Sequence, residues 1–160
     1  FIAEVVAAVL NTNEEALLHS LSRELDRQHH LVAAQGIECI GVRCLSSYHF
    51  RHVLFQTYLY QELDEVERAH LHGQVGRALE ACFEGQADAP IEISPQLARH
   101  FRLAGLVDRA VVYLQQAGER AVRMWANQEA VKHLTAGLAL LRTQPETPER
   151  DQQELSMQLA

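Results

Sequence analysis

Positive charge is scarce in this chain of 160 residues, in which Lys132 is the only lysine. The 14 Lys and Arg are outnumbered by 21 Asp and Glu, and the formal net charge is −7. Proteins bind the phosphate backbone of nucleic acids through clustered Lys and Arg. The composition therefore argues against nucleic-acid binding through this segment.

Long apolar runs are absent as well. The longest, at 2–10 and 138–141, are far shorter than the roughly 20 residues that a helix needs to cross a bilayer. Neither run has the basic flank of a signal peptide, so we expect no membrane partner. The chain begins at Phe1 without a methionine and ends at Ala160 inside a helical pattern. We therefore expect it to be a piece of a longer protein.

Cysteine is rare too, and the three that occur, Cys39, Cys44 and Cys82, form no secretory framework. An odd number of cysteines without such a framework indicates a reducing cytoplasm. Cys39 and Cys44, taken with His49 and His52, lack the spacing of about twelve residues that a zinc finger places between its ligand pairs. The two cysteines would also face opposite sides of a strand pair unless a bulge intervened. We therefore expect partly buried thiols and no metal site.

No motif for catalysis is present. The sequence contains neither a nucleophile elbow nor a G-x-x-x-x-G-K-[ST] loop, and without that phosphate-binding loop this segment cannot hydrolyse a nucleotide alone. The carboxylate pairs at 14–15 and 64–65 fall in the first turns of expected helices, where the helix dipole favours negative charge. We therefore expect no catalytic residues and no enzyme activity in this segment.

The first 62 residues follow the order of a small winged-helix-like domain. Apolar residues at helical spacing occupy 2–9, and Thr12 with Glu15 has the capping-box pattern that starts a second helix. Short strands are expected at 31–34 and 37–44, with turns or bulges at the glycines between and within them. Two short helices followed by a small sheet predict domain 1–62.

The segment Tyr48–Tyr60 turns from a strand-like alternation into a helix near Phe50 and places His52 at the joint. In a winged helix the second helix, expected here at 14–28, is the one that would enter a DNA groove. That helix has four acidic residues against two arginines and would repel a phosphate backbone. Nucleic acid is therefore not the partner that we expect.

Residues 63–92 are predicted to form a connecting helix and a linker. Asp64 and Glu67 have the spacing of a capping box at the start of the helix. Pro90 and several small residues mark the linker at 86–93. This segment therefore separates the first domain from the last.

Residues 93–160 resemble tetratricopeptide repeats, in which paired antiparallel helices mesh large side chains against small ones. The first helix begins at Ser94-Pro95, where the serine caps and the proline fills the first turn. The repeat pattern occurs twice, but its two passes, at Ala110 and Ala130, start only 20 positions apart, whereas a tetratricopeptide unit has about 34 residues. The helix at 108–124 must serve both passes, so we expect the irregular start of a longer array.

The predicted fold class is mainly α, with a small winged-helix unit and a short β wing followed by an irregular tetratricopeptide-like array. Pro145 and Pro148 are expected to close the last helical hairpin, and a helix at 149–160 to follow them. Five arginines in this region lie among acidic neighbours, and we expect a solvated face: Arg99, Arg102, Arg109, Arg120 and Arg123.

The segment Tyr48–Tyr60, the helix after Leu63 and the motifs Leu97–Phe101 and Ala117–Ala121 together resemble bacterial STAND-type signalling ATPases. In those regulators a nucleotide-binding domain is followed by a winged helix and a helical sensor array. The resemblance covers nearly the whole chain, and it is closest to proteins that join such an ATPase to adenylate/guanylate cyclase or transcription-factor modules. It implies a non-catalytic part in signal transduction, in which an unknown protein or small-molecule inducer on the repeats controls a nucleotide switch.

The resemblance also implies a nucleotide-sensing role for His52, with Arg51 beside it. In the family a winged-helix histidine reaches the phosphates of ADP on the upstream nucleotide-binding domain and holds the off state. The family's Met-His-Asp motif is matched here by Arg51, His52 and Val53, so the histidine agrees and its neighbours differ. ADP or ATP is thus implied for the upstream domain and no cofactor for this segment. A winged-helix DNA-binding regulator and a plain protein-interaction scaffold stay open as alternatives.

Overall fold

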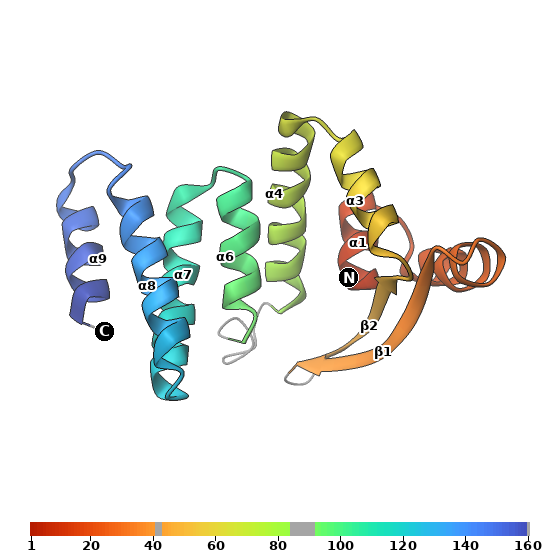
Figure 1. Cartoon of the computed structure of the whole chain (residues 1–160), viewed down its shortest axis with the longest axis horizontal. Helices are drawn as coiled ribbons and strands as arrows, with labels where there is room; N and C mark the ends of the chain where they lie inside the picture. Colours follow the sequence, from red (N-terminus) through yellow and green to blue (C-terminus); the bar gives the residue numbers. More distant parts are fainter. Residues whose placement is uncertain (41–42, 84–91, 160) are drawn as a thin grey trace. The chain divides into compact units, whose positions relative to one another are not determined.

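The computed structural model of the chain describes residues 1–40, 43–83 and 92–159 (Figure 1). The described part is mainly helical and contains a two-stranded antiparallel sheet, which confirms the predicted mixture of many helices and a small sheet. The chain divides into two compact units, Phe1–Gln86 and Ala87–Ala160. The finer boundaries at 62 and 92 stay a prediction. No helix in the described residues is long and apolar enough to span a bilayer.

The first unit begins with helices in the expected places: α1 (Ala3–Leu10), α2 (Glu14–His19) and the π-helix η1 (Ser20–Gln28). The predicted cap of the second helix was wrong, because Asn13 rather than Thr12 accepts the backbone N–H of Ala16, at 3.1 Å. Thr12 instead helps to close α1, since its backbone N–H donates to the carbonyl of Ala7 at 3.0 Å.

A β-hairpin follows, formed by β1 (Val32–Ile40) and β2 (Arg43–Phe50). The prediction of separate strands at 31–34 and 37–44 was wrong, because β1 continues through Gly36. The pairing register shifts between Ala34 and Gly36, and Gly36 has a φ of 140° that a side chain would strain. Gly41, the other glycine expected to allow a turn, lies outside the described residues.

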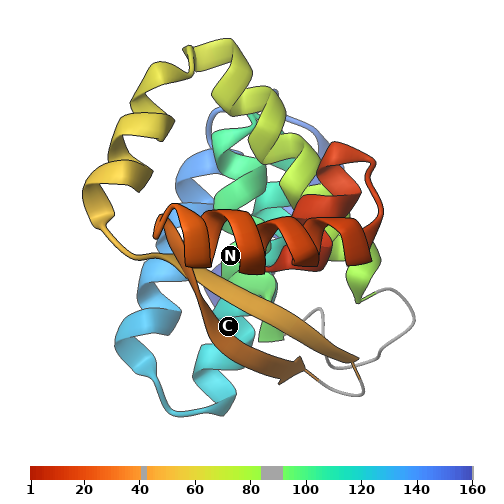
Figure 2. The same ribbon diagram turned by 90° about the vertical axis from the view of Figure 1, so that its right-hand side faces the viewer.

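Cys39 and Cys44 face each other across the hairpin and form a disulfide, with their Cα atoms 4.0 Å apart. Figure 2 shows the two strands side by side along their length. Directly opposed residues of an antiparallel pair point to the same face, so the expectation of opposite faces and partly buried thiols was wrong. Both cysteines are exposed, whereas Cys82 is buried and is not part of this disulfide. A disulfide persists in oxidising surroundings, so this pair gives no support to the reducing cytoplasm, which stays a prediction.

The core of the first unit joins its helices to the hairpin. Ala3, Leu21, Val32 and Tyr48 are buried together, and Leu17, Leu18, Leu25, Leu31 and Phe50 pack around them. The N-terminal amine donates to the carbonyl of Tyr48 at 2.6 Å, and the hydroxyls of Ser22 and Tyr48 lie 2.9 Å apart. The hairpin is therefore fixed to the N-terminal segment by apolar contact and by hydrogen bonds, including one from the backbone N–H of Ser46 to the Glu4 carboxylate at 3.0 Å.

Two more helices follow in the described part of the first unit: α3 (Val53–Glu62) and α4 (Glu65–Cys82). The predicted capping box of α4 is confirmed, because Glu67 donates its backbone N–H to Asp64 at 2.8 Å while its carboxylate accepts from the backbone of Asp64 at 3.1 Å. Helix α4 packs against α1. Most of the predicted linker at 86–93 lies outside the described residues.

The described residues of the second unit form consecutive helices that alternate in direction (Figure 1): α6 (Ser94–Leu103), α7 (Val107–Arg123), α8 (Asn127–Leu141) and α9 (Pro148–Leu159). The predicted start of α6 is one residue late. Ile93, not Ser94, is the cap, because its carbonyl already accepts from Gln96 and Leu97 at 2.9 and 3.0 Å. Pro95 lies in the first turn, as predicted.

Small residues set the distance between these helices. A Cβ added to Gly118 of α7 would lie 2.6 Å from Leu134 Cγ and Cδ2 of α8, and one added to Gly137 of α8 would lie 2.7 Å from Met157 Cε of α9. Val111, Leu141 and Met157 form the buried core between the three helices. The meshing of small against large residues that the sequence indicated is therefore present at these contacts.

The turns after α6 and α7 share a left-handed backbone residue. Gly105 has a φ of 71° and Trp125 a φ of 59°. Glycine adopts that conformation readily, whereas a bulky side chain is unusual there. The indole of Trp125 is also 87% exposed, so neither burial nor backbone preference accounts for a tryptophan at this position.

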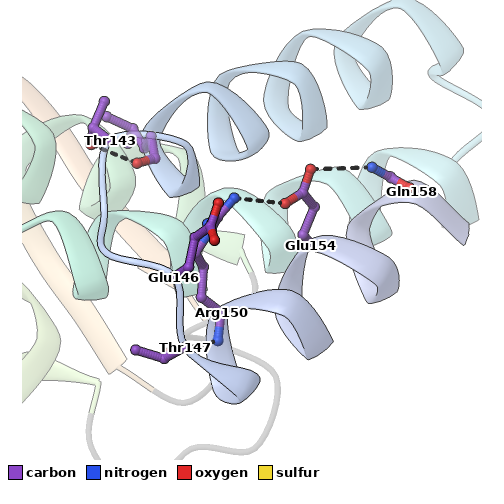
Figure 3. Close-up of polar contacts among 7 residues, drawn as sticks. Thr143, Glu146, Thr147, Arg150, Glu154 and Gln158 are labelled. Carbon is purple, nitrogen blue, oxygen red and sulfur yellow. Dashed lines mark hydrogen bonds and ion pairs between the residues drawn. The ribbon is translucent and has the colours of Figure 1, made fainter.

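The connection between α8 and α9 is held by side chains (Figure 3). Thr147 Oγ1 accepts the backbone N–H of Arg150 at 3.2 Å and so caps α9. The guanidinium of Arg150 lies 3.1 Å from the Glu154 carboxylate and 3.9 Å from that of Glu146. Gln144 donates to Asp108 of α7. The last hairpin, expected between Pro145 and Pro148, is thus fastened to α7.

We expect Gly118→Ala to lower the free energy of unfolding. Alanine favours a helix by about 1 kcal/mol over glycine, but overpacking against the branched Cγ of Leu134 costs about 1–3 kcal/mol. Gly137→Ala is the matched control, because the flexible end of Met157 can move away and the net change should be smaller. Urea denaturation of both variants measures the difference. Equal or higher stability of Gly118→Ala would show that the helices separate without cost.

Because Cys39 and Cys44 form a disulfide, we expect one reactive thiol, that of Cys82, in the unfolded chain before reduction and three after it. Thiol titration in denaturant, with and without a reductant, gives the count. Cys39→Ser/Cys44→Ser should also lose stability, by about 2 kcal/mol for so short a loop, whereas Cys82 stays titratable in that variant. Three reactive thiols before reduction would contradict the pairing.

Candidate functional site

His52 caps the helix that follows the hairpin. Its backbone is extended, with φ −134° and ψ 127°, and its Nδ1 accepts the backbone N–H of Leu54 at 3.3 Å. The ring meets Phe55 edge-on, with the ring centres 6.2 Å apart. Because Nδ1 is the acceptor, the proton of the neutral ring resides on Nε2. The exposed side chain of His52 therefore presents one N–H donor to its surroundings.

Arg51, the other predicted site residue, is engaged within the first unit. Its Nε donates to the carbonyl of Val32 at 3.0 Å, and its Nη2 lies 2.6 Å from the carboxylate of Asp26 in η1. Its backbone N–H also donates to the carbonyl of Leu31 at 3.0 Å. The structure thus places Arg51 and His52 side by side in the chain but gives them different surroundings: Arg51 joins η1 and β1 to the joint, while His52 caps α3.

The Arg51 guanidinium controls the charge on Asp26. Its hydrogen bond, which outweighs the opposing effect of burial, lowers the pKa of Asp26 below the usual 3.8. The carboxylate therefore stabilises the fold above about pH 4, and this contribution is lost as the pH falls through the lowered pKa. The ion pair fixes the guanidinium at the base of the joint.

Helix α3, which starts at this joint, buries none of its residues. It lies at the margin of the first unit, drawn in yellow in Figure 2. Six of its ten residues are large apolar or aromatic side chains that are 41% exposed or more: Val53, Leu54, Phe55, Tyr58, Leu59 and Tyr60. We call these six residues the α3 face.

The far end of α3 is fixed as well. The hydroxyl of Tyr60 lies 3.0 Å from Nε2 of His72 in α4, and the guanidinium of Arg68 lies over the Tyr60 ring, 5.1 Å from its centre. Arg68 also donates to the carbonyl of Leu63 at 2.8 Å. The α3 face is therefore held in position by contacts at both ends of its helix although it packs against little.

A hollowed surface lies within the second unit. Two adjoining cavities of about 170 and 410 Å³ share Pro95, Lys132 and His133 as lining residues. We call them together the α6–α8 groove. Arg99 and Arg102 of α6 line one cavity and Arg120 of α7 the other. These arginines were predicted, with others, to form a solvated face, and the groove was not predicted, because no single segment of sequence contains both walls.

Metal chemistry has no evident ligand set in the described residues. No group of three or more His, Cys, Asp or Glu side chains there is arranged to hold an ion. Cys39 and Cys44 bond to each other and so are not available as thiolate ligands. The arrangement at His52 offers a hydrogen-bond donor beside an apolar surface, which suits recognition of another molecule.

Comparison with protein-family models, with characterised proteins and with solved structures found no match to this chain.

Replacing Arg51 should release Asp26. We expect the pKa of the Asp26 carboxyl to rise toward 3.8 in Arg51→Ala, because the hydrogen bond that favours the carboxylate is lost. An NMR titration of the side-chain carboxyl measures the shift. Arg23→Ala, an exposed arginine on the same helix, should leave it unchanged. An unaltered Asp26 pKa in Arg51→Ala would show that the ion pair does not form in solution.

Proposed function

We propose that this chain is a non-catalytic regulatory part of a multidomain signalling ATPase of the STAND type. The first unit serves as a winged-helix-like module that docks on an upstream nucleotide-binding domain. The second serves as a tetratricopeptide-like sensor that binds a protein or small-molecule inducer. The observation that carries the proposal is the exposed α3 face directly after His52.

The α3 face supports docking on another domain. Large exposed apolar side chains gathered on one short helix mark an interaction site, and short helices gain most of their stability from packing their apolar side chains. The face is uncharged over its whole length, since Val53–Gln61 contains no acidic or basic residue and its other members, Gln56, Thr57 and Gln61, are neutral. An upstream domain, as the family resemblance implies, would bury this surface.

His52 supports the nucleotide part of the proposal. A phosphate offers oxygen acceptors only, and the cap on Nδ1 leaves Nε2–H as the donor directed at a partner. Arg51 acts here as the positioning residue, because its bonds to Asp26 and Val32 fix the backbone from which His52 projects. The histidine would thus join the α3 face and the phosphates of ADP in one docked state.

The switch requires an inducer that distinguishes two states. Binding shifts an equilibrium only by the difference in affinity for its two states. An inducer on the second unit must therefore bind more tightly when α3 and His52 have left the nucleotide-binding domain. Exchange of ADP for ATP would follow their release.

The proposal predicts that this chain alone does not bind ADP or ATP in calorimetry. The protein that carries the chain together with its upstream domain should bind ADP, and His52→Asn should raise the ADP dissociation rate by about tenfold, the loss of one charge-assisted hydrogen bond. Asparagine keeps an acceptor for the helix cap but has no imidazole. Fluorescent ADP displaced by excess ADP gives the rate.

His49→Asn is the matched control, since His49 is an exposed histidine on β2 and should leave the rate unchanged. In the same protein the amides of Val53–Glu62 should exchange more slowly with deuterium than in the chain alone, because docking covers them. ADP binding by the chain alone would refute the assignment. Equal rates for both variants with equal exchange of α3 would favour a plain repeat scaffold.

A further inference from the structure

The α6–α8 groove concentrates positive charge on a chain whose net charge is −7. Residues three positions apart share one side of a helix, so Arg99 and Arg102 lie together on α6. On α8, Glu129, Lys132 and His133 share a side in the same way. Both walls of the groove therefore direct basic side chains toward it.

The charges of the walls are only partly compensated. Glu129 is the one carboxylate among the lining residues of the two cavities, and it lies 3.6 Å from Lys132 Nζ and 3.8 Å from His133 Nε2. Within the described residues no carboxylate pairs with Arg99 or Arg102. Arg120 donates to the backbone carbonyl of Glu92 at 3.0 Å, which leaves its charge in place.

His133 adds a donor and little charge. Burial lowers the pKa of His133 despite the nearby Glu129 carboxylate, so the neutral imidazole prevails near pH 7. The cations that count at this pH are therefore Arg99, Arg102, Lys132 and Arg120, against one carboxylate. This balance is opposite in sign to that of the chain as a whole.

The floor of the groove is apolar and built of small side chains. Ala98, Ala117 and Ala121 are 2, 3 and 8% exposed and line it together with Pro95 and Leu114. Small residues let a bound backbone approach closely, while the long arginine and lysine side chains stand at the rim. A small floor between basic rims suits an extended chain with acidic side chains.

We propose that the α6–α8 groove binds an extended acidic peptide segment of a partner protein. The basic residues occupy two helices and two adjoining cavities, so several carboxylates spaced along a chain match them better than one compact anion does. Nucleic acid fits less well, because its phosphates continue along a backbone that extends past the groove, whereas a short peptide segment can confine its carboxylates to the basic residues that line it. The role of this peptide as the inducer rests on the proposed function. Its binding to the groove does not, and it can be tested without any nucleotide.

The test is fluorescence anisotropy of a labelled, end-capped peptide of alternating Glu and Ala, titrated with the whole chain. The same peptide with Lys for Glu should bind at least about tenfold more weakly, because its charges oppose those of the rims. Raising NaCl from about 0.1 M to about 1 M, which shortens the Debye length from about 10 Å to about 3 Å, should also weaken binding.

Arg99→Glu/Lys132→Glu should reduce the affinity for the acidic peptide by at least about tenfold. Arg123→Glu/Arg142→Glu is the matched control, because it makes the same change of charge at exposed positions of α7 and at the end of α8 that do not line the groove. Circular dichroism of both variants confirms that they fold. Ala117→Leu, which fills the floor, should weaken binding without any change of charge.

Four outcomes would overturn the proposal: no binding of the acidic peptide, equal loss in both charge variants, competition by citrate at the concentration of the peptide, or tighter binding of single-stranded oligothymidylate than of the peptide. Citrate competition would indicate a site for small anions, and oligothymidylate binding a nucleic-acid surface. Peptide binding with no effect on ADP release in the longer protein would refute only its role as inducer. ADP binding by the chain alone would refute the proposed function and leave the groove untouched.

Discussion

The first unit depends on the bonds that Arg51 makes at the end of the hairpin. One side chain joins η1, through Asp26, to β1, through the carbonyl of Val32. The next residue, His52, then starts a helix that buries none of its side chains. The far end of α3 is held by Tyr60, whose hydroxyl lies 3.0 Å from His72 of α4 and whose ring lies under the guanidinium of Arg68. The position of the proposed docking surface thus follows from polar contacts at the two ends of one helix, of which the guanidinium of Arg51 makes the first.

Much of the fold could be predicted because local sequence determines it. The capping box at Asp64 and the proline in the first turn of α6 depend on residues a few positions apart, and both predictions were confirmed. The prediction that Thr12 caps the second helix was wrong because Asn13 can accept the same backbone hydrogen bond, and the end of α1 engages Thr12 instead. The predicted strand boundaries were wrong for a related reason. A glycine permits both a turn and a bulge, and only strand pairing selects one of them.

The candidate site was predictable only where it is continuous in sequence. His52 could be placed at a strand-to-helix joint from the change in periodicity, but the engagement of Arg51 depends on Asp26, which lies 25 positions earlier. The α6–α8 groove could not be found at all, since its arginines and its lysine come from helices that meet only in the folded chain. The same holds for Cys39 and Cys44, whose pairing depends on the register of the hairpin. The winged-helix and tetratricopeptide likenesses, and the family itself, stay predictions.

The tryptophan in the turn after α7 has a practical consequence. Trp125 is the only tryptophan of the chain, its indole stands in solvent, and its neighbours Met124 and Ala126 line the larger cavity. Tryptophan fluorescence of the chain therefore originates from a single indole at the edge of that cavity. This chain contains an optical reporter that needs no label, and its emission describes one corner of the second unit instead of an average over many.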